Sequence, residues 1–98
     1  MNSKKLTVIA HFQARPDKEV ALRSALIKLI APTLKEQGCL NYDLHQSLDD
    51  PSKFVFYENW VCQEDLTAHL ASAHIEELRS KVDELCVVPP EITFWEQL

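Results

Sequence analysis

A carboxylate and two histidines lie close together in the middle of the chain, within the stretch FVFYENWVCQEDLTAHLASAHI. Glu58 stands in the same alternating row as Phe56 and Trp60, where its ionised form would be poorly solvated and its pKa raised. Such a group could accept a proton from a phenol or an enolisable carbon. The structural alternative is that Glu58 pairs with an Arg or Lys, or bonds His69 and pins a helix to the sheet.

His69 and His74 follow in a segment with helical spacing. Five residues turn an unbroken helix by about 140°, whereas joint metal ligation from one helix favours a separation of three or four. We therefore expect no metal site built on this pair. His69 borders the predicted apolar stripe, either as a buried, hydrogen-bonded histidine or as a proton acceptor or donor in a cavity. His74 either lines the mouth of that cavity or caps a helix end.

Two large amphipathic side chains, Tyr42 and Trp60, fall on neighbouring predicted strands. In a cavity they would stack on a flat substrate while the phenol hydroxyl supplies an orienting hydrogen bond. Otherwise both are ordinary core residues. Asn41 alternates onto the opposite strand face and binds substrate only if that face lines the cavity.

The spacing of apolar residues predicts the elements that position these groups. Period-two patterns predict strands, and spacings of three and four predict helices. Pro32 should kink the first helix because it has no backbone N–H for the carbonyl of Lys28. Gly38 should end that helix. We expect strands at 6–14, 39–48, 53–61 and 91–98, and helices at 15–38 and 64–85, the second broken near Ser72.

The order β-α-β-β-α-β predicts an α+β, ferredoxin-like split β-α-β fold, with one four-stranded antiparallel sheet and helices on one face. The uncovered face would then carry more apolar surface than a soluble monomer usually exposes. A symmetric homodimer would bury it; the alternative is ordinary scatter of apolar residues on a surface. The residues concerned are Ile9, Val55, Tyr57, Val61 and Trp95.

Composition limits the classes of function. Ninety-eight residues suit a single domain, 1–98, and a formal net charge of −5 argues against nucleic acid as a partner. No apolar run approaches the roughly 20 residues that span a bilayer. Cys39, Cys62 and Cys86 are odd in number and widely spaced, which argues against a disulfide framework and favours reduced thiols in the cytoplasm.

The run from Glu36 to His74 resembles the antibiotic biosynthesis monooxygenase family, and the opening LTVIAHFQARPDKE resembles the start of that family's domain. The pattern is a Gly-Cys, a Tyr three positions on, a turn with Pro, an aromatic-x-x-Glu-x-Trp strand and His-x-x-x-x-His. The matching residues are Gly38, Cys39, Tyr42, Pro51, Phe54, Glu58, Trp60, His69 and His74.

This resemblance implies a dimeric α/β barrel and, as the leading hypothesis, a quinol monooxygenase-like enzyme. Such an enzyme would be cofactor-independent and act on an electron-rich aromatic, such as a quinol or anthrone, with molecular oxygen. His69 or Glu58 would be the base that removes a proton from the substrate. Trp60 and Tyr42 would form the walls of the substrate cavity, and His74 would lie at its rim.

Two other functions occur or are plausible on this fold. One is a non-catalytic, small-ligand-binding or stress-response dimeric barrel. The other is a phospho-sugar isomerase, which would need cationic groups for the phosphate; Lys35 and Arg79 could serve only if they reach the cavity.

Known cofactors fit the sequence poorly. Haem-binding relatives use a helical histidine about two turns beyond the position of His69 and an asparagine on the first strand. Here Glu77 and Arg79 occupy that helical region, and no asparagine lies between Leu6 and Ala14. One glycine in the whole chain cannot build the phosphate loop of a flavin or nicotinamide site. We expect no cofactor.

Overall fold

The computed structural model describes residues 5–98 and confirms the predicted α+β, ferredoxin-like fold. The predicted domain begins at residue 1, but residues 1–4 lie outside the described part. The strands are β1 (Leu6–Gln13), β2 (Cys39–Gln46), β3 (Lys53–Trp60) and β4 (Glu91–Trp95). The helices are α1 (Glu19–Ile27), α2 (Ile30–Leu34), α3 (Gln63–Leu70), α4 (Ala73–Arg79) and α5 (Val82–Leu85).

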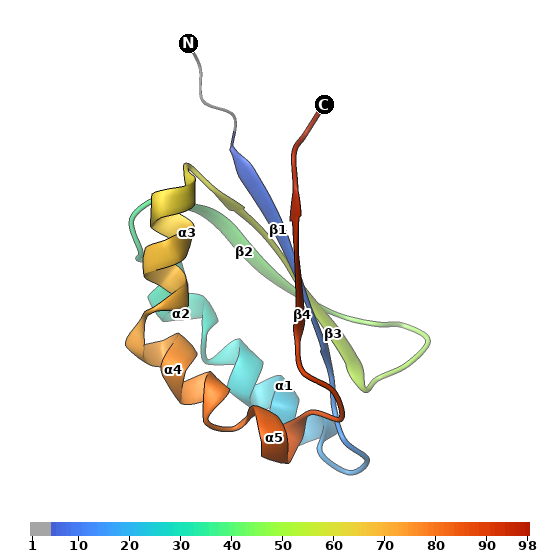
Figure 1. The fold of residues 1–98 in the computed structure, drawn as a ribbon. Coiled ribbons are helices and arrows are strands. Elements are labelled where there is room, and N and C mark those ends of the chain that lie inside the picture. Colours follow the sequence, from blue (N-terminus) through green and yellow to red (C-terminus); the bar gives the residue numbers. More distant parts are fainter. Residues whose placement is uncertain (1–4) are drawn as a thin grey trace.

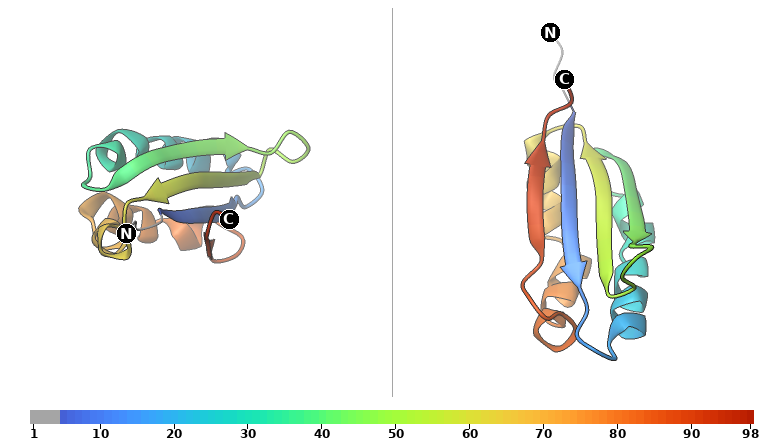
Figure 2. Two further views of the ribbon diagram at one scale, coloured as in Figure 1. Left: turned by 90° about the horizontal axis from the view of Figure 1, so that it is seen from above. Right: turned by 90° about the vertical axis from the view of Figure 1, so that its right-hand side faces the viewer.

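The four strands form one antiparallel sheet in the order β2-β3-β1-β4. All five helices lie against one face of it (Figure 1). Among residues 5–98, no helix lies on the opposite face, as the view onto the sheet shows (Figure 2). We call these the helix face and the open face.

Both predicted helical regions are interrupted. The first is divided at Lys28 and Leu29, just before Pro32, whose ring nitrogen cannot bond the carbonyl of Lys28. The second is divided at Ala71 and Ser72, close to the predicted break, and again at Ser80 and Lys81, which the apolar spacing did not reveal. Within residues 5–98, no helix has the length and apolar character needed to cross a membrane.

Ser72 fixes the angle between α3 and α4. Its hydroxyl donates to the carbonyl of His69 at 2.7 Å, which closes α3. The same oxygen accepts from the backbone N–H of Ile75 at 3.4 Å, as an N-cap of α4. One side chain therefore ends one helix and starts the next.

The core lies between the sheet and the helices. Alternate residues of β1 and β3 point to the helix face, as the period-two pattern predicted. Glu58 is one of them and is 3% exposed. The residues buried at this interface include Val8, Ala10, Phe12, Phe54, Phe56 and Trp60 from the sheet and Leu22, Leu26, Leu66, Ile75 and Leu78 from the helices.

Gly38 has a backbone φ of +82°, a conformation that residues with a Cβ rarely adopt. It also lies against α3. A Cβ at this position would lie 2.6 Å from the Asp65 Cβ, so rotation of the Asp65 side chain cannot relieve the clash. We predict that Gly38→Ala lowers the free energy of unfolding by about 2 kcal/mol or more. Urea denaturation measures this. Gln37→Ala, at the exposed neighbouring position, is the control; an equal effect of both would contradict the prediction.

Candidate functional site

A cavity of about 400 Å³ lies on the helix face of the sheet. Its walls are mostly aliphatic and aromatic, with a few ionisable groups among them. Pockets for small molecules commonly have volumes of about 300–1,000 Å³ and this kind of lining. The lining residues are Val8, Ala10, Phe12, Tyr42, Glu58, Leu66, His69, Leu70, Ile75, Leu78, Arg79, Val82, Asp83, Pro90 and Ile92.

Glu58 is a buried acid on the floor of this cavity, between Val8 of β1 and Tyr42 of β2 in the strand register. Its Oε1 accepts a hydrogen bond of 2.8 Å from the indole Nε1 of Trp60. Burial raises the pKa of the Glu58 carboxyl to about 7; the Trp60 hydrogen bond opposes this shift and the charge of Glu36 adds to it. Near neutral pH the carboxyl can therefore donate or accept a proton.

The structural partners predicted for Glu58 are different from those observed. We expected an Arg, a Lys or His69, whereas the hydrogen-bond partner of Glu58 within residues 5–98 is the indole of Trp60. His69 bonds a different carboxylate. The alternation pattern placed Trp60 beside Glu58 on the same strand face, but it did not reveal that the indole N–H would bond the carboxylate.

Tyr42 and Trp60 have different positions relative to the cavity. Tyr42 lines it, stacked on Phe56 with ring centroids 4.2 Å apart and edge-on to His69 at 5.4 Å. Burial raises the pKa of the Tyr42 hydroxyl, so it stays protonated and can donate a hydrogen bond. Trp60 is fully buried behind the lining, with its ring 4.7 Å from that of His69. It therefore contacts both Glu58 and His69 without lining the cavity itself.

His69 lines the cavity and is 2% exposed. Its Nδ1 lies 3.0 and 3.2 Å from the two carboxylate oxygens of Glu36. Burial lowers the pKa of His69, and the hydrogen bond and charge of Glu36 oppose the shift. A neutral imidazole must donate from Nδ1 to bond a carboxylate, which we infer as its tautomer. Nε2 then keeps its lone pair and is the nitrogen that can act as a base.

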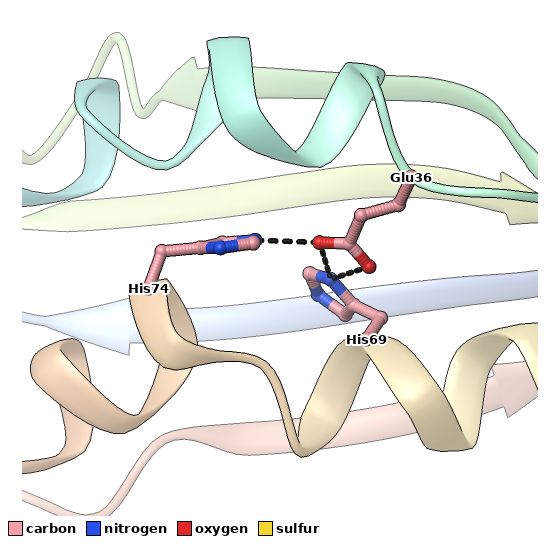
Figure 3. A group of neighbouring side chains, drawn as sticks. All are labelled: Glu36, His69 and His74. Atoms are coloured by element: carbon pink, nitrogen blue, oxygen red, sulfur yellow. Dashed lines mark hydrogen bonds and ion pairs between the residues drawn. The ribbon is translucent and has the colours of Figure 1, made fainter.

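His74 reaches the same carboxylate from the next helix, with its Nε2 2.5 Å from Glu36 Oε2 (Figure 3). The expectation that the two histidines diverge assumed an unbroken helix. The break at Ser72 removes that assumption and lets both imidazoles converge on Glu36. His74 does not line the cavity; it lines a neighbouring hollow, together with Glu36, Asp65 and Ser72.

Glu36 is the residue that the sequence reasoning missed. It follows α2 and lies 33 residues before His69, and no local pattern connects the two. It also completes a possible set of metal ligands, since His69 Nδ1, His74 Nε2 and a Glu36 oxygen lie within 4.8 Å of one another.

Asn41 lies on the open face, away from the cavity. Its Nδ2 donates to Asp43 Oδ2 at 3.0 Å and to the carbonyl of Tyr57 at 3.1 Å, and its Oδ1 accepts from Asn59 at 2.8 Å. The structure therefore brings Tyr42, Glu58 and His69 together at one cavity and leaves Asn41 in a polar network on the other side of the sheet.

Comparisons with known proteins agree with this architecture. The family model for antibiotic biosynthesis monooxygenase matches residues 5–81. A Mycobacterium tuberculosis protein named "Putative monooxygenase Rv0793" is 39% identical over 88 residues, covering 90% of this chain and 86% of that protein. Its solved structure superposes with a TM-score of 0.90, covering 96% of this chain and 95% of that one. PA3566 from Pseudomonas aeruginosa gives a TM-score of 0.93 at 33% identity, covering 98% and 96%.

The raised pKa of Glu58 makes the stability of the fold depend on pH. Between pH 4.5 and about 7 the folded state binds more protons than the unfolded state, so stability falls as pH rises. Gln keeps the acceptor for Trp60 without the charge. As the pH rises from 4.5 to 8, we predict that the free energy of unfolding of Glu58→Gln increases by about 1–3 kcal/mol relative to that of the wild type.

Urea denaturation at the two pH values measures this difference. Glu91→Gln, which removes an exposed carboxylate, is the matched control. A constant difference between wild type and Glu58→Gln across the pH range would contradict the assignment of a raised pKa.

Proposed function

Because the chain belongs to the antibiotic biosynthesis monooxygenase family, we propose that it is a cofactor-independent monooxygenase of an electron-rich aromatic, such as a quinol or an anthrone. The observation that carries this proposal is the cavity of about 400 Å³ in which His69, Glu58 and Tyr42 meet. A base, an acid of intermediate pKa and a phenolic donor surround one apolar space. That is what an oxygenation without a bound cofactor requires of the protein.

The first step is removal of a proton from the substrate. His69 is the favoured base, because Glu36 holds Nδ1 as the donor and leaves Nε2 unprotonated. The imidazolium formed would be stabilised by the same carboxylate. Tyr42 donates a hydrogen bond to the oxygen on which negative charge develops, in a site where few water dipoles compete.

The substrate anion then supplies the electrons. It transfers one electron to O₂, and the radical pair combines into a carbon-bound peroxide. When a CH₂ group is oxidised, the peroxide loses water and leaves a carbonyl, so one oxygen atom enters the product and the other leaves as water. Glu58, with a pKa of about 7, can protonate the departing oxygen.

Glu58 is the alternative base. The dependence of activity on pH distinguishes Glu58 from His69 as the group that removes the proton. If Glu58 removes the proton, activity rises as its carboxyl ionises, with an apparent pKa of about 7. If His69 does so, Glu58 is needed in its protonated form and activity falls through the same range. Glu58→Gln removes this ionisation in either case.

A phospho-sugar isomerase is less well supported by the lining. Arg79 does line the cavity, but Lys35 is not among the lining residues. The Arg79 guanidinium is paired with Glu76, and Asp83 lies on the same wall. The largely apolar surface suits a flat aromatic better than a phosphorylated sugar. A non-catalytic binder of such aromatics would use the same surface.

We also propose that residues 1–98 act as one domain and that two copies pair through the open face, as a dimeric barrel in the cytoplasm. Tyr57, Val61 and Trp95 are 42%, 46% and 55% exposed there, which supports burial by a second copy. Cys39, Cys62 and Cys86 are all free thiols, as a reducing compartment allows.

Oxygen uptake tests the proposed reaction. Protein treated with a chelator is mixed anaerobically with a panel of quinols and anthrones, and air is then admitted. We predict uptake by the wild type and a loss of about 100-fold or more in His69→Ala, because the base is removed. His45→Ala, at an exposed position on β2, is the control.

Two outcomes contradict the proposal. If no quinol or anthrone is consumed but flat aromatics bind, the protein is a binding module. If uptake needs a metal that the chelator removed, the reaction is not cofactor-independent.

Pairing through the open face is tested by the mass in solution. We predict a species of twice 11.3 kDa for the wild type. Tyr57→Glu should dissociate it, because it places a carboxylate in the apolar interface. Light scattering after gel filtration gives the mass, with Thr67→Glu on α3 as the control. A wild-type monomer would contradict the proposed dimer.

A further inference from the structure

We propose that Glu36, His69 and His74 form a binding site for a divalent transition-metal ion of the Zn²⁺ class. The three ligand atoms are His69 Nδ1, His74 Nε2 and a carboxylate oxygen of Glu36, all within 4.8 Å of one another (Figure 3). Two imidazoles and a carboxylate make one of the common ligand sets for zinc and for other first-row metals. Imidazole ligands disfavour Mg²⁺ and Ca²⁺, which prefer oxygen.

The ligand atoms lie close enough together for side-chain rotations to bring them around one ion. Bonds of about 2.0–2.1 Å at tetrahedral angles separate ligand atoms by roughly 3.3 Å. His69 Nδ1 lies 3.0 Å from Glu36 Oε2, and His74 Nε2 lies 2.5 Å from the same oxygen. An ion therefore requires these two pairs to separate by less than about 1 Å. The two nitrogens, which lie within 4.8 Å of each other, must come to the same spacing through side-chain rotation.

The backbone already fixes the directions of the ligands. Ser72 closes α3 and caps α4, which sets the angle at which the two histidines approach Glu36. His69 is 2% exposed, packed between Trp60 and Tyr42. A ligand held by its packing loses little entropy when the metal binds.

The hollow beside the cluster gives an ion a route in. It has a volume of about 310 Å³ and is lined by Glu36, His74, Ser72 and Asp65, among others. The carboxylates of Glu36 and Asp65 favour entry of a cation, and the chain as a whole has a net charge of −5. Three protein ligands leave at least one coordination position for water or another small ligand from this hollow.

Metal binding would change the state of His69. An ion on Nδ1 requires the proton of the neutral ring to be on Nε2, the nitrogen that the proposed oxygenase uses as its base. A bound ion is therefore expected to inhibit that reaction. The site itself does not depend on the reaction, so metal binding is measured without substrate.

Calorimetry on chelator-treated protein provides the test, with Zn²⁺ as the titrant and Co²⁺ as a spectroscopic probe. We expect one ion per chain with a Kd in the micromolar range or below, and the intense visible absorption of four-coordinate Co²⁺. Glu36→Ala and His74→Ala should each weaken binding by about tenfold or more, since each removes a ligand. His45→Ala and Cys62→Ser are the controls; Cys62 lies 3.2 Å from Asp65, near the hollow.

Nuclear magnetic resonance of the histidine rings gives a second reading on the wild type, in case a variant does not fold. Zn²⁺ should shift the ring signals of His69 and His74 and leave those of His11 and His45 in place. The proposal is overturned if wild-type binding is in the millimolar range or weaker, if folded His74→Ala binds as tightly as the wild type, or if the shifted signals come from other residues. Each of these results would show that the cluster only connects the helices through hydrogen bonds and does not bind metal.

Discussion

The carboxylate of Glu36 is the interaction on which the site depends. It comes from the segment between α2 and β2, and it bonds histidines from two different helices. A carboxylate that accepts two N–H groups at 2.5–3.0 Å is largely compensated for its partial loss of water. Without it, His69 would be a buried imidazole with an unbonded Nδ1, free to adopt either tautomer. Glu36 thus connects the packing of the helices to the chemistry of the cavity.

The two ionisable groups of the cavity have different environments. His69 is kept neutral by burial but oriented by Glu36, whereas Glu58 is bonded only by the neutral indole of Trp60 among the described residues. Burial therefore dominates at Glu58 and raises its pKa to about 7. Pairs of groups whose environments move their pKa values in opposite directions are typical of acid–base sites. Trp60 contacts both, so this arrangement is also part of the core.

Much of the fold was predictable because it depends on local patterns. Alternation divided the residues of β1 and β3 between two faces, and Pro32 and Ser72 marked interruptions of the helices. The candidates Glu58, His69 and Tyr42 line one cavity in the structure, although the sequence did not establish which strand face lines it. Glu36 could not be predicted, because its contact with His69 depends on how the end of one helical region packs against another. The same packing decides that His74 points to Glu36, whereas spacing on an ideal helix predicted divergence.

The tautomer of His69 tests this account most directly. Nitrogen-15 spectra of the histidine rings, recorded on chelator-treated protein near pH 7.5, distinguish a protonated Nδ1 from a protonated Nε2. The account predicts a neutral His69 with the proton on Nδ1 in the wild type, and loss of that preference in Glu36→Ala, which removes the acceptor of Nδ1. A wild-type ring protonated on Nε2, or one whose tautomer is unchanged in Glu36→Ala, would contradict the claim that Glu36 prepares His69 as a base.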